Sequence, residues 1–137
     1  MSKGSRRERE LRDELSDREF VVVRTAGSGS APGFDLPDLL VGDGTRIWAI
    51  EVKSWDPEAN RTYYLEPEEV DSLQRFSRRF SPNTEARVGI RVDYDTTWYI
   101  PLLSSLPPRT EGGRVPLRSH NTDDMPTLDD ALRGPLG

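Results

Sequence analysis

The sequence predicts a single α/β domain in which helices pack on a β-sheet. The chain has 137 residues and no cysteine, a length that suits one hydrophobic core without disulfides or structural zinc. Residues 5–18 and 67–80 have the apolar spacing of amphipathic helices, and short runs rich in β-branched and aromatic residues lie between and after them. We expect residues 1–106 to form the body of the domain and residues 107–137 to be a peripheral C-terminal tail of it.

Composition excludes several classes of protein. The absence of cysteine excludes cysteine chemistry, and the longest uncharged stretch, residues 96–108, contains prolines and is far shorter than the roughly 20 apolar residues of a membrane span. The amino terminus is basic and polar with no apolar segment, so we expect no export signal, no membrane partner and a cytoplasmic location. The single histidine, His120, lies in the polar tail and is interpreted as a surface residue.

The charge balance is unusual because lysine is nearly absent. Only Lys3 and Lys53 are lysines among the 19 basic residues, against 24 acidic residues and a formal charge of −5. An acidic, lysine-poor surface suits a halophilic protein, although a GC-rich genome produces the same bias. The acidic net charge argues weakly against a nucleic-acid partner, so the local distribution of charge decides that question.

The first predicted element is the helix over residues 5–18. Ser5 and Glu8 have the spacing of a capping box, and Leu11 and Leu15 stand one turn apart. Glu8 has two interpretations. It is either a helix cap or an inward acid, because it lies within about 60° of both leucines on the helix surface.

The next elements are strands and a loop. Residues 20–23 form a β-rich run, and residues 25–37 are rich in Gly, Ser and Pro, which is typical of a loop. Residues 38–41 and 47–52 then predict a hairpin with Asp43-Gly44 at the centre of a type I′ turn. This turn pairs Gly42 with Thr45, so position 38 faces position 49.

The later elements alternate strand and helix. We predict a short strand at residues 62–65, a helix at residues 67–80 with proline in its first turn, and strands at residues 86–92 and 97–100. Only a short closing turn, at residues 128–132, is expected after that.

One strand face of the hairpin carries the candidate chemistry. Side chains alternate along a strand, so Asp38, Ala49, Glu51 and Lys53 share one face, while the opposite face is apolar. Asp38 and Glu51 are expected to be diagonal neighbours about 7–8 Å apart at their Cα atoms, a span that two carboxylates can close around one cation. The alternative is an exposed Glu51–Lys53 ion pair at a strand end.

Ordered motifs along the chain strongly resemble the archaeal Holliday junction resolvases, which are PD-(D/E)xK, restriction-endonuclease-like nucleases. The similarity extends from about residue 3 to residue 100. The motifs are Lys3-Gly4, Glu8-Arg9-Glu10-Leu11, Phe20-Val21-Val22-Val23-Arg24, Ser28-Gly29-Ser30, Pro37-Asp38-Leu39, Glu51-Val52-Lys53 and Phe76-Ser77-Arg78-Arg79-Phe80.

The resemblance implies a restriction-endonuclease-like α/β fold with a central mixed β-sheet flanked by helices. It implies a homodimeric, structure-specific endonuclease that resolves four-way DNA junctions in recombination and repair by paired, metal-dependent hydrolysis. Mg²⁺ is the expected cofactor, with Mn²⁺ as a substitute. The alternatives are another PD-(D/E)xK nuclease acting on duplex, flap or foreign DNA, or a junction-binding protein without catalysis. Partners among other recombination proteins are not identified by the sequence.

The resemblance also assigns roles to residues. It makes Glu8, Asp38 and Glu51 the acidic metal-site residues, Lys53 the catalytic lysine and Ser28 a loop serine that contributes to activity. Phe76 and Phe80 correspond to aromatics at the dimer interface. Basic residues cluster on the first helix, and the predicted DNA contacts are Lys3, Arg6, Arg7, Arg9, Arg24 and Ser30.

Overall fold

The computed structural model describes residues 3–25, 30–31, 34–59, 61–93 and 95–133. The elements, in chain order, are α1 (Lys3–Ser16), β1 (Val21–Arg24), β2 (Ser30–Ala31), β3 (Phe34–Asp35), β4 (Leu39–Gly42), β5 (Ile47–Trp55), β6 (Thr62–Leu65), α2 (Pro67–Phe80), β7 (Thr84–Val92), β8 (Trp98–Tyr99), the 3₁₀ segment η1 (Leu103–Ser105), β9 (Val115–Arg118), the 3₁₀ segment η2 (Ser119–Asp124) and α3 (Leu128–Arg133).

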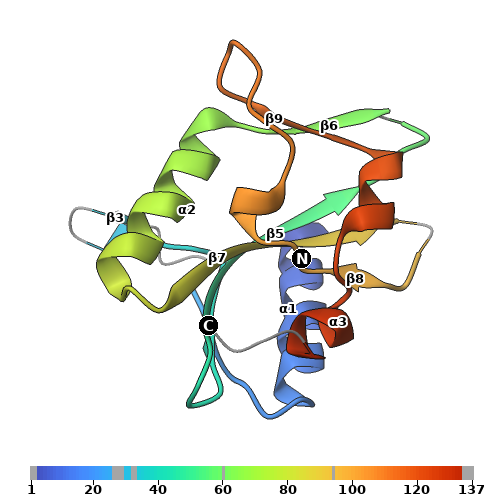
Figure 1. Ribbon diagram of the computed structural model, residues 1–137. Coiled ribbons are helices and arrows are strands. Elements are labelled where there is room, and N and C mark those ends of the chain that lie inside the picture. The colour runs from blue at the N-terminus through green and yellow to red at the C-terminus, as the bar shows by residue number, and fades with distance from the viewer. Residues whose placement is uncertain (1–2, 26–29, 32–33, 60, 94, 134–137) are drawn as a thin grey trace.

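A five-stranded mixed sheet forms the centre of the molecule (Figure 1), in the order β1-β4-β5-β7-β8. β1, β4 and β5 are antiparallel neighbours, whereas β5 and β7 run parallel, from Ile47 opposite Thr84 to Trp55 opposite Val92. Parallel neighbours need a crossover, and β6 and α2 provide it. The predicted mixed sheet with flanking helices is confirmed.

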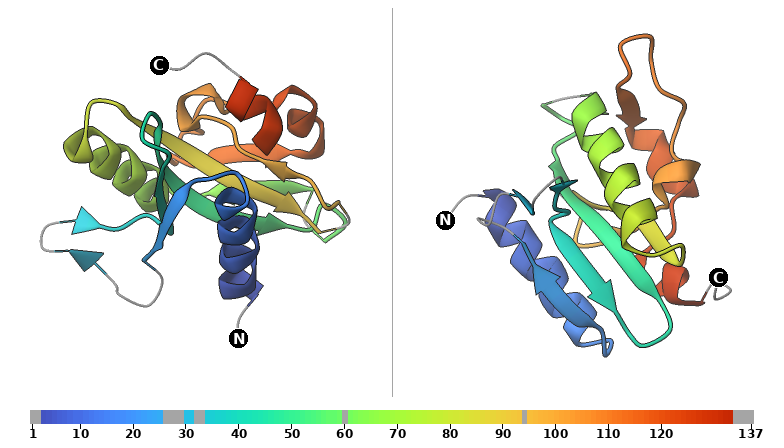
Figure 2. Two further views of the ribbon diagram at one scale, coloured as in Figure 1. Left: turned by 90° about the horizontal axis from the view of Figure 1, so that it is seen from below. Right: turned by 90° about the vertical axis from the view of Figure 1, so that its left-hand side faces the viewer.

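The helices lie on opposite faces of this sheet, as Figure 2 shows for α1 and α2. On one face, Leu11 and Leu15 of α1 are fully buried against Trp48 and Ile50 of β5. On the other face, α2 packs its buried Val70, Leu73 and Phe76 onto Ala49, Val88 and Ile90 of the sheet. The alternation of β5 therefore places Glu51 and Lys53 on the face covered by α2.

A glycine allows α1 to lie close to the sheet. A Cβ atom at Gly89 of β7 would come within 2.7 Å of Leu11 Cδ2 and within 3.3 Å of Ile50 Cγ2. Ser5 lies inside α1 rather than at its start, so the interpretation of Glu8 as a cap of Ser5 is not supported. The inward orientation of Glu8 next to buried Leu11 is the one observed.

The hairpin has a register shifted by two residues from the predicted one. Gly42 pairs with Ile47 and Leu39 with Ile50, and the Asp43 N–H donates to the Arg46 carbonyl at 3.3 Å, so the tip of the turn is Gly44-Thr45. Asp43 Oδ1 accepts hydrogen bonds from the N–H groups of Thr45 (2.9 Å) and Arg46 (2.6 Å), which favours a turn that begins at Asp43 over one with Asp43 at its centre. A shift of two residues leaves every side chain on its predicted face, but it changes the cross-strand partners.

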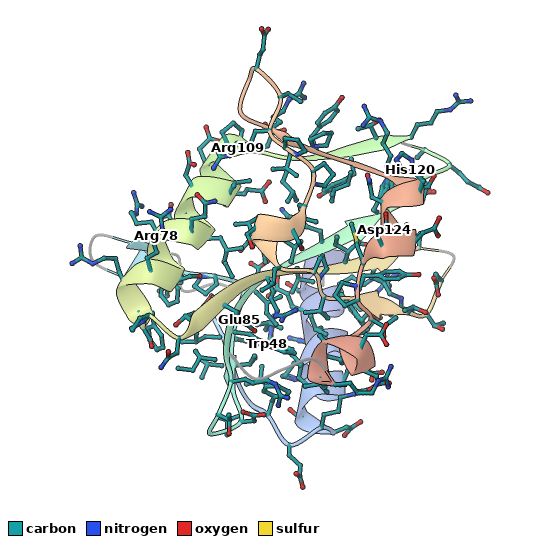
Figure 3. The ribbon with its side chains drawn as sticks, viewed as in Figure 1. Trp48, Arg78, Glu85, Arg109, His120 and Asp124 are labelled. Carbon is teal, nitrogen blue, oxygen red and sulfur yellow. The ribbon has the colours of Figure 1, made fainter. Side chains whose placement is uncertain are left out.

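The last part of the chain contributes more than the predicted short turn. β9 pairs with β6, from Thr62 opposite Arg118 to Leu65 opposite Val115, and Val115 and Leu117 are buried in the core. The expectation of a peripheral tail overlooked this strand. α3 confirms the predicted turn near residue 128, and His120 is exposed as predicted, on η2 (Figure 3). Within the described residues, no helix combines the length and the apolarity needed to cross a membrane.

Candidate active site

Two carboxylates face one another where β4 begins. Asp38 directly precedes β4, and continuing the observed register from Leu39 opposite Ile50 places it opposite Glu51. Asp38 Oδ2 accepts a hydrogen bond from the N–H of Val52 at 2.8 Å, which ties the start of β4 to β5. The diagonal relation expected from the sequence is wrong, and the direct opposition brings the two acids closer together.

Burial disfavours the ionised forms of both acids, and at Glu51 the Asp38 charge adds to this effect. Burial, followed by the nearby Asp38 charge, raises the pKa of Glu51 to about 7. Burial also raises the pKa of Asp38, although the Val52 N–H, the Lys53 charge and a hydrogen bond with Glu51 oppose this shift. A divalent cation would relieve this repulsion, because it favours both ionised carboxylates.

Glu8 approaches the pair from α1. Its side chain is only 13% exposed, and its Oε1 lies 3.5 Å from Nη2 of Arg24 in β1. Burial and the Asp38 charge raise the pKa of Glu8, whereas Arg24 lowers it. This oxygen makes no hydrogen bond with any part of the chain that the structure describes, so it is available as an acceptor.

Lys53 lies on the same face of β5 as Glu51, as predicted, but it has a partner that the sequence did not reveal. Its Nζ forms an ion pair with Oε2 of Glu69 in α2. A pocket of about 250 Å³ opens beside this pair, and Asp38, Glu51, Glu69 and Leu73 contribute to its walls. The site is therefore a polar recess between the sheet and the amino-terminal end of α2.

The donor set suits a hard cation without forming a complete cage. Carboxylate oxygens are the ligands that Mg²⁺ and Mn²⁺ prefer, and the acceptor on Glu8 and the repulsion between Asp38 and Glu51 fit a divalent ion. Within the described residues, no three His, Cys, Asp or Glu side chains are grouped closely enough to hold one ion together. The opposed pair is therefore the primary candidate, and Glu8 is the outlying third acid.

The predicted DNA contacts have different surroundings. Arg6 and Arg9 are exposed on α1, whereas Arg24 is half-buried beside Glu8. Lys3 begins α1 and Ser30 begins β2. Ser28, predicted to contribute to activity, lies outside the described residues.

Arg7 is a correction to the predicted DNA surface. It is only 8% exposed, and it pairs with Glu10 at 2.8 Å and with Asp93 at 3.5 Å. Glu10 also pairs with Arg91 of β7 at 2.8 Å. These contacts tie α1 to the end of β7, so Arg7 has a structural role instead of facing DNA.

The two predicted interface aromatics are differently exposed. Phe76 is 8% exposed and belongs to the core under α2, whereas Phe80 is 51% exposed at the end of the helix. Their rings stack with centroids 5.3 Å apart. Phe80 is therefore the residue of the two that is free to contact another surface, and Phe76 supports it from below.

The fold is that of a restriction-endonuclease-like nuclease: helices cover both faces of a mixed sheet, and an Asp–Glu–Lys set lies where β4 and β5 meet. The solved structure of Archaeoglobus fulgidus Hjc, a Holliday junction resolvase, matches with a TM-score of 0.79 and 30% identity, over 93% of this chain and 98% of that one.

The family described as archaeal Holliday junction resolvase (Hjc) matches residues 1–128, and the chain belongs to that family. Two relatives are named crossover junction endodeoxyribonuclease Hjc. The one from A. fulgidus is 41% identical over 66% of this chain and 62% of its own length. The one from Sulfurisphaera tokodaii is 26% identical over 96% of this chain and 87% of its own length. The match to the first relative thus spans less than two thirds of that protein.

Proposed function

We propose that this chain is a crossover junction endonuclease that cuts four-way DNA junctions by metal-dependent phosphodiester hydrolysis. The observation that carries the proposal is the opposed Asp38–Glu51 pair, half-buried beside Lys53, in a chain of the archaeal Holliday junction resolvase family. The Asp38 charge and burial together raise the pKa of Glu51, so the ionised pair is unfavourable without a cation. Such a pair is typical of a site that binds a cation.

Asp38 and Glu51 would hold Mg²⁺, or Mn²⁺ in its place, with the backbone carbonyl of Val52 as a further oxygen ligand. When bound, the ion supplies Lewis-acid stabilisation of the charge that develops on the scissile phosphate. Lys53 stabilises the same charge with its ammonium group. Glu8 accepts a hydrogen bond from water at the site, and Arg24 opposes the rise in the pKa of that carboxylate.

Exposed arginines supply the contacts with DNA. Arg6 and Arg9 project from α1, and Arg78, labelled in Figure 3, projects from α2 next to the equally exposed Arg79. Arginine forks bind phosphate oxygens in a bidentate manner. Backbone contacts of this kind position a protein on a DNA shape without reading its sequence, which is what recognition of a junction requires.

A resolvase must cut two strands that are related by symmetry. We therefore include a homodimer in the proposal, because a two-fold dimer presents two identical sites in a fixed relation. The exposed ring of Phe80, supported by Phe76, is the proposed apolar contact between the two copies.

The test compares three substrates of equal length and labelling: a four-way junction, a flap and a linear duplex. The proposal expects cleavage of the junction alone, in Mg²⁺ but not in EDTA. Equal cleavage of all three would favour a general nuclease of the same fold. Tight binding of the junction without nicking in Mg²⁺ or Mn²⁺ would favour a junction-binding protein without catalysis.

A further inference from the structure

The ion pair between Lys53 and Glu69 joins the two elements that enclose the site. Lys53 belongs to β5 and Glu69 to α2, and their side chains are 17% and 28% exposed. A lysine side chain is long and flexible, with a compact ammonium group at its tip. The position of the Lys53 ammonium group therefore depends on a fixed, partly buried partner such as Glu69.

Glu69 is itself held in place by the start of its helix. Its Oε1 accepts a hydrogen bond from the N–H of Glu66 at 3.1 Å, which completes the capping box of α2. Pro67 occupies the first turn, and buried Val70 and Leu73 fix the helix on the sheet. One carboxylate thus caps the helix with one oxygen and holds the lysine with the other.

Lys53 has competing partners nearby. Its charge favours the ionised forms of both Asp38 and Glu51, so it is close enough to be attracted to them. An ammonium group resting on these oxygens would neutralise the pair that we assign to the cation. Glu69 offers a negative charge from α2 in the wall of the same pocket, and Lys53 forms its ion pair with Glu69.

We propose that Glu69 is a positioning residue, which holds the Lys53 ammonium group away from the Asp38–Glu51 pair and directs it toward the substrate. The effect of Glu69 on catalysis rests on the proposed function, whereas its effect on the position of the Lys53 side chain does not. It predicts that the charge of Glu69, rather than its role as a helix cap, is what the site needs.

Two variants separate these roles. Glu69→Gln keeps the length of the side chain and an oxygen that can accept the Glu66 N–H, but it removes the charge. Asp71→Asn is the matched control, because it removes one charge from the same helix. Asp71 is 63% exposed and pairs with Arg109 at 2.7 Å, away from the site.

The low lysine content makes a direct measurement possible. Lysine labelled with ¹³C and ¹⁵N gives side-chain NMR signals for only Lys3 and Lys53, and loss of one set in Lys53→Arg assigns them. In Glu69→Gln we expect the order parameter of the Lys53 Cε methylene to fall markedly, whereas Asp71→Asn leaves it unchanged. An unchanged Lys53 signal in Glu69→Gln would overturn the inference.

Single-turnover cleavage provides the second readout. We expect Glu69→Gln to slow junction cleavage by about 10–100-fold, because the reacting group is misplaced, with junction affinity and melting temperature close to wild type. In a Lys53→Ala background the same change should have no further effect. Cleavage at the rate of Asp71→Asn would refute the positioning role. If the wild type cuts no junction, the proposed function fails, and the NMR result still decides the role of Glu69.

Discussion

Glu51 lies in an environment unlike that of an ordinary surface acid. Burial and the facing Asp38 raise its pKa to about 7 from a usual value of 4.5. The folded protein therefore binds a proton at Glu51 between these two pH values, where the unfolded chain has already released it. A bound cation has the opposite effect, because it favours the ionised carboxylate.

The raised pKa predicts a pH dependence of stability in metal-free protein. Because the folded-state pKa lies above the unfolded one, the free energy of unfolding should fall as pH rises from about 4.5 to about 7, by on the order of 1–3 kcal/mol. Glu51→Gln should remove most of this slope. Urea titrations in EDTA across this range measure it, and identical slopes for both proteins would refute the assignment.

Arg7 yields a prediction that separates folding from DNA binding. Arg7→Ala should destabilise the protein by about 1–3 kcal/mol, since it removes a buried side chain together with its ion pairs to Glu10 and Asp93. Arg6→Ala, at an exposed position of the same helix, should change stability by less than about 0.5 kcal/mol. Denaturant unfolding of both variants makes the comparison, and equal effects would contradict the structural role of Arg7.

For Arg6→Ala we expect an effect on DNA binding instead of stability. Its loss should weaken junction binding and reduce the slope of log affinity against log salt by about 0.9, because one phosphate contact disappears.

At the scale of elements, side-chain periodicity predicted which face each site residue occupies. Alternation along β5 placed Glu51 and Lys53 together, and the helical spacing of Leu11 and Leu15 placed Glu8 inward. The predicted hairpin register was wrong, because the Asp43 side chain accepts hydrogen bonds from two backbone N–H groups and favours a turn that begins at Asp43 instead of one centred on Asp43-Gly44. An error of two residues preserved the faces, so Asp38, Glu51 and Lys53 still share one face of the hairpin.

The sequence pattern did not predict contacts between elements that are distant along the chain. Glu69 showed only a helix-start spacing with Glu66, and nothing local indicated that α2 would place it at Lys53. Arg7 looked like part of a basic helix face because its partner Asp93 lies at the far end of β7. β9 was missed because it is short and contains Pro116, which is tolerated at the edge of a sheet.

The close packing of α1 on the sheet, which brings Glu8 to the site, predicts that Gly89→Ala is destabilising. The added Cβ would meet Leu11 at 2.7 Å in a fully packed region, at a cost of about 1–3 kcal/mol. Gly112→Ala is the control, since its nearest neighbouring atom is 3.9 Å away. Urea unfolding tests this, and a Gly89→Ala protein as stable as the control would show that α1 has room to move.

At the scale of the whole molecule, the proposed homodimer depends on a small exposed apolar surface. Phe80→Ala should convert dimer to monomer in light scattering while changing the stability of the fold little, because the ring is 51% exposed. Val21→Ala, at a 73% exposed valine of β1, is the control and should remain dimeric. A wild-type monomer at working concentration would refute the dimer.

The measurement that tests the central claim most directly compares wild type with Glu51→Gln on one labelled four-way junction. Binding and cleavage are measured on the same protein samples, which must be folded and of the same oligomeric state. We predict that the wild type cuts in Mg²⁺ and that Glu51→Gln loses cleavage by at least about 100-fold. Junction affinity should be equal or tighter in the variant, because a carboxylate that repels phosphate is gone. Near-normal nicking by Glu51→Gln would contradict the assignment of Asp38 and Glu51 as the metal site, and with it the proposed mechanism.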